Sequence, residues 1–303
     1  MRKRGIGRVL GPAPQALKPA SHSGYDLPVK HPATGPAPEG RLRLIEGRHN
    51  ALVKDLRRAF GRSEPISDGC VAIEGVRIIE EAIRSGLRFR AIFFSASAEN
   101  RAQRLLPQLR SHVETVMLPD RLFASAVPTE GPQGVAALVH LKERKLEDVL
   151  HRLETGPVVV LAGLQDPGNL GTILRSAEAF GSAGALLGEG TVSALNAKAV
   201  RASAGSVFRL PVVHENLSSA LPVLRGQGVR VLATSSHKGV PLSQANLAGT
   251  IAVLLGNEGA GVPRDLLAHV DETVVIPHSP QVESLNAGIA ASIILYEAAR
   301  QKK

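Results

Sequence analysis

The sequence predicts an α/β protein whose C-terminal half is a parallel sheet covered by helices on both sides. Three observations support this prediction. Short apolar runs alternate with helical segments from residue 158 onwards, most of these runs are apolar throughout, and glycine-rich turns follow several of them. Continuous apolar strands separated by helices are typical of parallel sheets that are buried on both faces.

Residues 1–41 differ in composition from the rest of the chain. The first forty residues contain seven prolines, and residues 1–67 carry 13 lysines or arginines against five acids. This surplus of eight nearly accounts for the formal net charge of +9. Basic, proline-rich segments with little apolar pattern rarely fold. We therefore predict a disordered extension, which either contacts RNA phosphates or is inert.

The segment 42–66 is predicted to be a basic leader helix. Leu52, Leu56 and Phe60 share one helical face, and cations stand beside it. A basic amphipathic helix is typical both of nucleic-acid binding and of a solubilising surface, so both interpretations stay open. The cations are Arg48, Lys54, Arg57 and Arg58.

Residues 67–141 predict a small α/β domain, because strands and helices alternate there over short intervals. Strands are expected at 70–74, 89–95, 115–118 and 135–139, and helices at 76–85, 100–111 and 120–126. Several arginines are candidate RNA contacts, although neighbouring acids such as Glu80 and Glu81 favour an ordinary solvated surface. These candidates are Arg77, Arg84, Arg88 and Arg90.

A charged linker helix at 142–155 separates this domain from the C-terminal one, 156–303. There we expect strands at 158–164, 184–187, 208–213, 229–233, 251–255 and 273–276, and helices at 170–180, 194–204, 217–225, 262–267 and 284–300. The periodicity alone predicts a Rossmann-like parallel sheet and no finer detail of the fold.

Composition narrows the protein class. A chain of 303 residues with 44% hydrophobic content can bury two cores. The sequence has no apolar run of bilayer length and no signal-peptide pattern, which predicts a soluble cytoplasmic protein without a membrane partner. The single cysteine, Cys70, excludes an intramolecular disulfide and a cysteine-based metal cage, so no metal site is predicted. The positive charge makes a polyanion partner plausible.

Three stretches of the C-terminal domain place polar residues in turns next to buried elements. They span 158–181, 251–263 and 276–300. In the third, Ser284 stands where a side-chain oxygen would cap the last helix. That helix is nearly all apolar, so we expect it to be more deeply buried than a surface helix. The polar residues of the three stretches are Asn169, Arg175, Asn257, Glu258, Ser284 and Asn286.

In order, spacing and residues, these stretches closely resemble the signature motifs of the SpoU-type (TrmH) RNA ribose 2'-O-methyltransferases of the SPOUT class. Two positions depart from the family pattern, because His278 and Pro280 stand where the family usually has Met and Gly. The positions Glu74-Gly75 and Pro132-Gln133-Gly134 resemble the ribosomal-protein-like RNA-binding domain that these enzymes carry ahead of the catalytic domain.

The resemblance implies an enzyme that uses S-adenosylmethionine to methylate a ribose 2'-hydroxyl of RNA. It also implies a homodimer and a C-terminal segment threaded into a trefoil knot, which the general rule against knotted chains would not suggest. Ribosomal RNA is favoured over transfer RNA, because a separate substrate domain is typical of the ribosomal enzymes. Methylation of transfer RNA and a non-catalytic RNA-binding scaffold remain the alternatives.

The same resemblance assigns contacts with the methyl donor. It places the adenosine-contacting backbone at Gly256, Ile276 and Leu285, and Thr234 is a weaker fourth candidate beside an ordinary strand-end role. Glycines at the ends of parallel strands allow such a close approach of backbone to ligand. An NAD-binding oxidoreductase could use the glycines of 256–261, but only about 40 residues follow them, too few for a dinucleotide domain.

On the acceptor side, the resemblance points to Arg175. A guanidinium with a pKa above about 12 is better suited to clamp a phosphate and stabilise a developing alkoxide than to act as a general base. Both roles stay open at this point. Asn169 and Glu258 are expected to orient other groups, and Ser284 and Asn286 to shape the donor loop.

Overall fold

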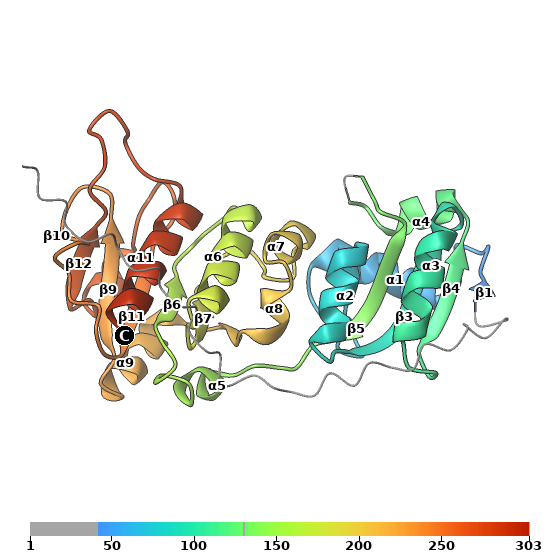
Figure 1. Ribbon diagram of the computed structural model, residues 1–303, viewed down its shortest axis with the longest axis horizontal. Helices are drawn as coiled ribbons and strands as arrows, with labels where there is room; N and C mark the ends of the chain where they lie inside the picture. Colours follow the sequence, from blue (N-terminus) through green and yellow to red (C-terminus); the bar gives the residue numbers. More distant parts are fainter. Residues whose placement is uncertain (1–41, 130, 303) are drawn as a thin grey trace, which may run out of the picture. The chain divides into compact units, whose positions relative to one another are not determined.

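The computed structural model describes residues 42–129 and 131–302, which form two sheets with their helices (Figure 1). We name them the N-terminal region (42–140) and the C-terminal region (146–302). The predicted extension at 1–41 lies outside the described residues. No helix in the described ranges is long and apolar enough to cross a membrane.

The N-terminal region contains a five-stranded mixed sheet in the order β1-β4-β3-β5-β2, in which β5 runs antiparallel to β2 and β3. Its strands are β1 (Arg43–Leu44), β2 (Cys70–Glu74), β3 (Arg88–Ser95), β4 (Glu114–Leu118) and β5 (Val135–His140). Its helices are α1 (Ala51–Arg62), α2 (Val76–Arg84), α3 (Glu99–Leu105) and α4 (Asp120–Ala126), with single 3-10 turns at Ala96–Ala98 and Leu106–Gln108.

Both faces of this sheet are buried. Alternate residues of a strand point to opposite faces, so Phe93 packs with Leu56 of α1 while its neighbour Phe94 packs with Ile79 of α2. All four side chains are fully enclosed. The predicted arrangement of a sheet with helices on its faces is what the chain forms here.

Helix α1 begins later than the sequence suggested. The side chain of Asn50 accepts a hydrogen bond from the Leu52 amide and caps the helix, which then runs from 51 to 62. Ahead of it, Arg43–Leu44 pairs with β4 as a short parallel strand. The segment 42–66 is therefore a strand, a turn and a helix rather than one leader helix.

The C-terminal region contains a seven-stranded sheet in the order β10-β12-β9-β11-β6-β7-β8, and every pairing in it is parallel. Its strands are β6 (Val158–Leu161), β7 (Gly184–Leu187), β8 (Val212–His214), β9 (Arg230–Ser235), β10 (Val240–Pro241), β11 (Ile251–Leu255) and β12 (Glu272–Val275). Its helices are α5 (Leu146–Leu150), α6 (Pro167–Ala179), α7 (Ala197–Ala202), α8 (Ser206–Arg209), α9 (Leu217–Gly226), α10 (Arg264–Leu267) and α11 (Ala287–Gln301).

Helices cover both faces of this sheet, which explains why its strands are apolar throughout. Val159 belongs to the core formed with α6, α7 and α11, whereas Val160 belongs to the core formed with α5 and α9. Helices α6 and α11 lie side by side in Figure 1, and Ser176 and Ser292 hydrogen-bond across them at 2.7 Å. The predicted parallel sheet in a mixed α/β fold is confirmed.

Two expected elements differ from the structure, and a third element was not expected. The strand expected at 208–213 is wrong in its first half, because Gly205 takes a φ of +86° and opens the short helix α8, so that β8 begins only at Val212. The linker helix is shorter than expected, and β10 was not predicted. A two-residue strand has no periodicity that could reveal it.

Candidate functional site

A cavity of about 510 Å³ lies where β9, β11 and β12 end. Thr234, Gly256 and Ile276 come from these three strand ends, and the turn before α11 closes the cavity on another side. In parallel sheets, ligands bind at this carboxyl edge, because the strand ends present backbone groups that no neighbouring strand uses. The volume lies within the usual range of small-molecule sites.

Eight of the nine residues that were expected to act in catalysis or donor binding line this cavity, and so does Asn257. Seven of the eight come from the three motif stretches and Thr234 comes from the end of β9, and the fold brings them together. They are Asn169, Thr234, Gly256, Glu258, Ile276, Ser284, Leu285 and Asn286. The ninth, Arg175, is not among the lining residues.

One wall of the cavity is a tight turn at Asn257–Gly261. The two end residues exchange backbone hydrogen bonds of 3.0 and 2.9 Å, and the Asn257 side chain accepts from the amides of Gly259 and Ala260. Gly256 sits under this turn without space for a side chain, since an added Cβ would lie 2.1 Å from the carbonyl carbon of Gly261. The turn is therefore stabilised by its own hydrogen bonds and by close packing against Gly256.

A chain of side-chain hydrogen bonds joins the three motif stretches at the rim. Asn286 Nδ2 donates to Asn169 Oδ1 at 2.8 Å, and Asn169 Nδ2 donates to Glu258 Oε1 at 3.3 Å. The Glu258 carboxylate also accepts from the amides of Gln165 and Asp166, each at 3.4 Å. Asn169 uses both ends of its amide group, which fixes it between an acceptor and a donor.

Asp166 belongs to this site but was not singled out from the sequence. Its side chain accepts from the Asn169 amide at 2.7 Å and caps α6, while Lys198 donates to its other oxygen at 3.1 Å. These contacts hold the pKa of Asp166 below its usual value. An Asp followed by Pro at the first helical position is a known start signal, so the sequence did contain a clue.

Asn286, not Ser284, caps α11. Its Oδ1 accepts from the amides of Gly288 and Ile289 at 2.9 and 3.2 Å, and the helix begins at Ala287. The expected cap at Ser284 is therefore wrong. Asn286 combines two roles, since its Oδ1 fixes the helix and its Nδ2 holds Asn169.

We expect replacement of Asn286 by alanine to lower the free energy of unfolding by about 1 kcal/mol, the usual value of a lost cap, and also to weaken binding at the cavity. The matched control is Asn216→Ala, because Asn216 caps α9 in the same way but does not line this cavity. Chemical denaturation and calorimetry with S-adenosylmethionine measure the two effects. Equal ligand affinity in both variants would show that Asn286 acts only as a cap.

Arg175 is exposed on α6 and does not line the cavity of its own chain. It follows Asn169 by six residues, which places it about 9 Å farther along the helix axis and about 120° around it. Among the described residues, none forms a hydrogen bond or ion pair with it. The described lining of the cavity in a single chain thus lacks the arginine that is expected on the acceptor side.

The outward face of α11 is apolar. Ile289, Ile293 and Tyr296 are 54%, 36% and 56% exposed, and the ring of Tyr296 meets the ring of Phe180, which directly follows α6, edge to face at 5.8 Å. The opposite face of the helix is buried with Ala291, Ile294, Leu295 and Ala298, so the helix has more apolar surface than its own chain covers. Large apolar side chains gathered on one exposed face are typical of an interaction surface.

His278, one of the two departures from the motif, also lines the cavity. Its Nδ1 lies 2.7 Å from the carbonyl oxygen of Ile276, so the imidazole is fixed against the end of β12. Pro280 is exposed in the following turn. The loop before α11 therefore has a histidine, held at the end of β12, at the position where the family usually has Met.

The cavity contains no lysine or arginine among its described lining residues. Its floor is apolar, with Leu255, Val274 and Ile294, and its rim carries hydroxyl and amide groups and the Glu258 carboxylate. Such a lining disfavours a ligand with phosphate groups and tolerates one with a positive charge. No cluster of three or more potential metal ligands occurs in the described part of the chain.

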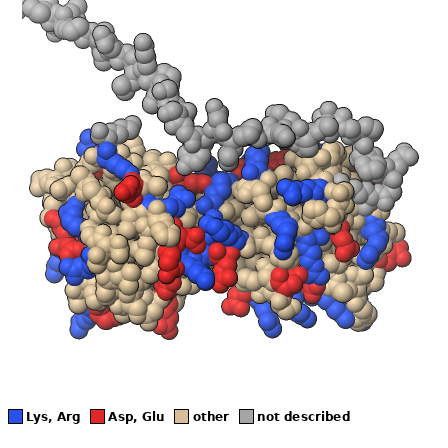
Figure 2. Space-filling view, turned by 90° about the horizontal axis from the view of Figure 1, so that it is seen from below, with Lys and Arg blue, Asp and Glu red and all other residues tan. Residues whose placement is uncertain are grey.

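Positive charge is not concentrated on the face drawn in Figure 2, where basic and acidic side chains are interspersed. Of the predicted RNA contacts, Arg90 donates to Asp55 and Asp68, and Arg84 donates to Glu81. Arg84 therefore pairs with a neighbouring acid, as expected for an ordinary surface arginine, whereas Arg90 pairs with two acids that are distant in the sequence. The other two candidates, Arg77 and Arg88, are exposed.

Comparisons with family models identify both regions. Residues 156–296 match the model of the SpoU rRNA Methylase family, and residues 50–137 match the MRM3-like substrate binding domain. The second match covers most of the N-terminal sheet and its helices.

Known proteins resemble the chain over most of its length. The 23S rRNA (guanosine(2553)-2'-O)-methyltransferase RlmP of Bacillus subtilis is 34% identical over 255 residues, which are 84% of this chain and 98% of the relative. The 23S rRNA (guanosine-2'-O-)-methyltransferase RlmB of Escherichia coli is 30% identical, over 76% of this chain and 98% of its own. The SpoU methyltransferase AviRb from Streptomyces viridochromogenes, solved in complex with the cofactor AdoMet, superimposes with a TM-score of 0.74 at 29% identity, over 83% and 98% of the two chains. The chain belongs to the SpoU rRNA methylase family.

Proposed function

We propose that the protein transfers a methyl group from S-adenosylmethionine to a ribose 2'-hydroxyl of ribosomal RNA, in the cytoplasm. The observation that supports this most directly is the cavity, which has an apolar floor, a polar rim and no cation among its described lining residues. It suits an adenosine attached to a positively charged sulfonium and does not suit a dinucleotide with its phosphates. The family relatives with AdoMet bound agree with this choice of cofactor.

In this proposal the donor lies against the strand ends. The backbone of Gly256, Ile276 and Leu285 contacts the adenosine, Thr234 contributes from the end of β9, and Ser284 and Asn286 shape the turn that closes the cavity. When bound, S-adenosylmethionine supplies an activated methyl group whose sulfonium loses its positive charge on transfer. The protein's own task is positioning, because in-line attack requires the hydroxyl and the methyl group to be aligned.

Asn169 and Glu258 orient the acceptor side of the site. Their mutual hydrogen bond, together with the bond from Asn286, ties the first turn of α6 to the donor wall. Arg175 binds the target phosphate and stabilises the alkoxide that develops as the hydroxyl attacks. A guanidinium suits both tasks because it stays protonated and offers several donors in a fixed plane.

We propose that the active form is a homodimer in which α6 and α11 form the interface. Three facts about the single chain support a second copy as the occupant of this surface. The face of α11 with Ile289, Ile293 and Tyr296 is exposed, Arg175 on the adjacent α6 is exposed, and the cavity lacks an arginine. A two-fold interface would bring Arg175 of one protomer towards the cavity of the other. The C-terminal trefoil knot belongs to the same proposal.

We further propose that the chain consists of a leader segment (42–66), a substrate-binding domain (67–141), a linker (142–155) and a methyltransferase domain (156–303). The match of residues 50–137 to a substrate binding domain supports the role of the N-terminal region. The nucleotide and its base are set by that region and not by the donor cavity.

The decisive experiment is an assay of the purified protein with labelled S-adenosylmethionine. Ribosomal RNA and transfer RNA are offered separately, and the product is digested to locate the label on ribose or base. We expect label on the ribose of ribosomal RNA. Label on transfer RNA alone would favour the transfer RNA alternative, and donor binding without any transfer would favour a non-catalytic scaffold.

Deletion of residues 1–40 tests the role of the basic extension. Because this segment carries a large share of the surplus charge, its removal should flatten the dependence of RNA affinity on salt, by roughly one unit of slope per lost phosphate contact. Filter binding between low and physiological salt measures the slope. An unchanged slope would identify the extension as inert.

A further inference from the structure

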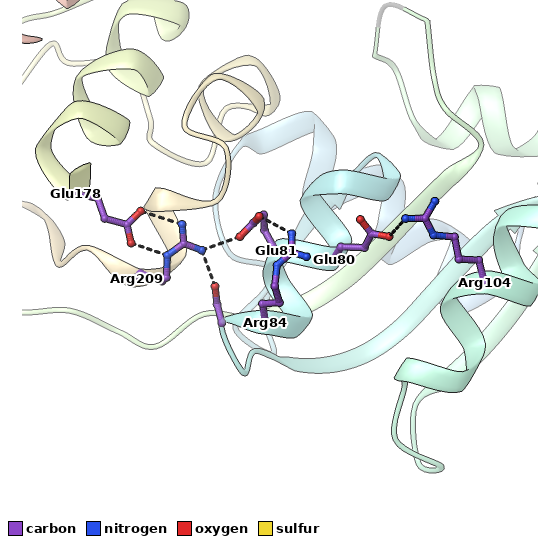
Figure 3. A network of polar contacts seen from close by, with 7 residues as sticks. Glu80, Glu81, Arg84, Arg104, Glu178 and Arg209 are labelled. Atoms are coloured by element: carbon purple, nitrogen blue, oxygen red, sulfur yellow. Dashed lines mark hydrogen bonds and ion pairs between the residues drawn. The ribbon is translucent and has the colours of Figure 1, made fainter. Parts of the chain in front are cut away.

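Arg209, the last residue of α8, forms a hydrogen-bonded hub that the motif analysis did not reveal (Figure 3). Its guanidinium binds Glu178 with two parallel bonds, from Nε at 2.5 Å and from Nη2 at 2.8 Å. Its remaining nitrogen, Nη1, donates to Glu81 at 3.0 Å and to Ser85 at 3.1 Å. A single side chain therefore serves three partners in the fork geometry that makes arginine–carboxylate pairs strong.

The partners of Arg209 belong to both regions of the chain. Glu178 lies on α6, the helix that also carries Asn169 and Arg175, whereas Glu81 and Ser85 lie on and directly after α2 of the N-terminal region. The three charged side chains are only 26–37% exposed, so water screens them less than an ordinary surface pair. Burial alone would raise the pKa of Glu178, but hydrogen bonds from Arg209 and Ser206 hold it below its usual value.

A second observation, independent of charge, marks the same contact. Gly205, which precedes α8, has a left-handed φ of +86°, and a Cβ placed on it would lie 2.7 Å from the Cβ of Glu81. The backbone at the start of α8 thus lies directly against α2. The close approach and the salt bridge lie at opposite ends of one four-residue helix, and together they fix both its ends on α2.

Both apolar and polar contacts join the two regions elsewhere, and Ile73 of β2 and Val200 of α7 belong to one buried apolar cluster. Arg201 of α7 lies 3.6 Å from Glu74, which is buried and also accepts from the Gln133 amide at 2.6 Å. Ser193 donates to the carbonyl oxygen of Ser63 at 2.8 Å. Apolar burial is non-directional, so directional bonds such as those of Arg209 are what specify one orientation of the two regions.

We propose that Arg209 is a positioning residue that ties α6 to α2 and so sets the orientation in which RNA held by the N-terminal region meets Arg175 and the donor cavity. This inference rests on the proposed function. Arg209 itself need not touch RNA or donor. It acts through Glu178, which lies one helical turn after Arg175, so a change in the bond to α2 alters where the substrate region sits relative to the reacting groups.

Replacement of Arg209 by glutamine tests the proposal, with Arg104→Gln as matched control. Arg104 forms a 2.8 Å bond with Glu80, the neighbour of Glu81, but both partners lie within the N-terminal region (Figure 3). For Arg209→Gln we expect the single-turnover rate at saturating RNA and donor to fall by roughly 10- to 100-fold, the cost of a small misplacement of reactants. Donor affinity and RNA affinity should change less than about twofold, and Arg104→Gln should match the wild type on all three measurements.

A double-mutant cycle separates the contact from general destabilisation. Glu81→Gln should reproduce part of the rate loss, and the double variant Arg209→Gln/Glu81→Gln should be no slower than Arg209→Gln alone, since one bond is lost only once. Arg209→Lys should rescue the rate only in part, because an ammonium group cannot bind Glu178 in a fork. Full additivity of the two losses, or a wild-type rate in Arg209→Gln, would overturn the proposal.

A structural measurement tests the inference even if the protein proves not to transfer methyl groups. Spin labels on cysteines introduced at the exposed positions Gln103 and Gln227 report the distance between the two regions, and the native Cys70 is fully buried. Pulsed dipolar spectroscopy should give a narrow distribution in the wild-type background and a broader or shifted one with Arg209→Gln. An unchanged distribution would refute a positioning role, whereas absent transfer in the wild type would refute only the proposed function.

Discussion

Replacing Arg175 by alanine should lower the single-turnover rate of methyl transfer by about 10²- to 10³-fold, the usual cost of removing one group that stabilises developing charge. Donor affinity and self-association should stay at wild-type values. The structure gives the reason for this separation, because Arg175 is exposed on α6 and does not line the cavity where the donor is proposed to bind. A residue that acts only on phosphate and alkoxide lowers the rate without weakening the donor complex.

The measurement combines single-turnover methylation, calorimetry with S-adenosylmethionine and sedimentation on the same preparation. Arg121→Ala, which removes another exposed arginine from the N-terminal region, is the control for loss of charge. Near-normal turnover in Arg175→Ala would remove this residue from the mechanism. A loss of donor affinity equal to the loss of rate would place Arg175 on the donor side instead.

The sequence was sufficient for the parallel sheet and for most of the cavity. Strands such as Val158–Leu161 are buried on both faces, and for this reason all their residues are apolar. The polar residues after them had to meet at the carboxyl edge, because all strands run in one direction. The importance of Gly256 was also visible in the sequence, and the structure gives the reason, since it leaves no space for a side chain there.

Two kinds of feature could not be predicted from the sequence. Ser284 and Asn286 are both good capping residues two positions apart, and only the backbone geometry decides which of them starts the helix. Arg209 shows the second kind, because its partners Glu178 and Glu81 are 31 and 128 residues away in the chain. Local periodicity contains no information on contacts of that separation.

Replacing Gly256 by alanine should weaken donor binding by about 5- to 150-fold, which corresponds to the 1–3 kcal/mol that overpacking usually costs. The added methyl group would meet the carbonyl of Gly261 and the amide of Val262 at 2.1–2.3 Å, so the turn at Asn257–Gly261 has to move. That turn forms a wall of the cavity. Gly226→Ala is the control, because nothing lies within 4 Å of a Cβ at that exposed helical position. Unchanged donor affinity in a folded Gly256→Ala protein would move the donor site elsewhere.

The two variants together decide whether a site is shared between protomers. With the donor kept well below its dissociation constant for Gly256→Ala, each homodimer should be nearly inactive, Arg175→Ala for lack of the arginine and Gly256→Ala for lack of bound donor. If Arg175 of one protomer serves the cavity of the other, a re-paired mixture contains heterodimers with one intact site, and activity should return to roughly a quarter of the wild-type level for random pairing of a two-fold dimer. If each protomer uses its own Arg175, the mixture stays inactive. In the heterodimer the intact arginine is then on one protomer and the intact donor cavity is on the other, so neither protomer has a complete site.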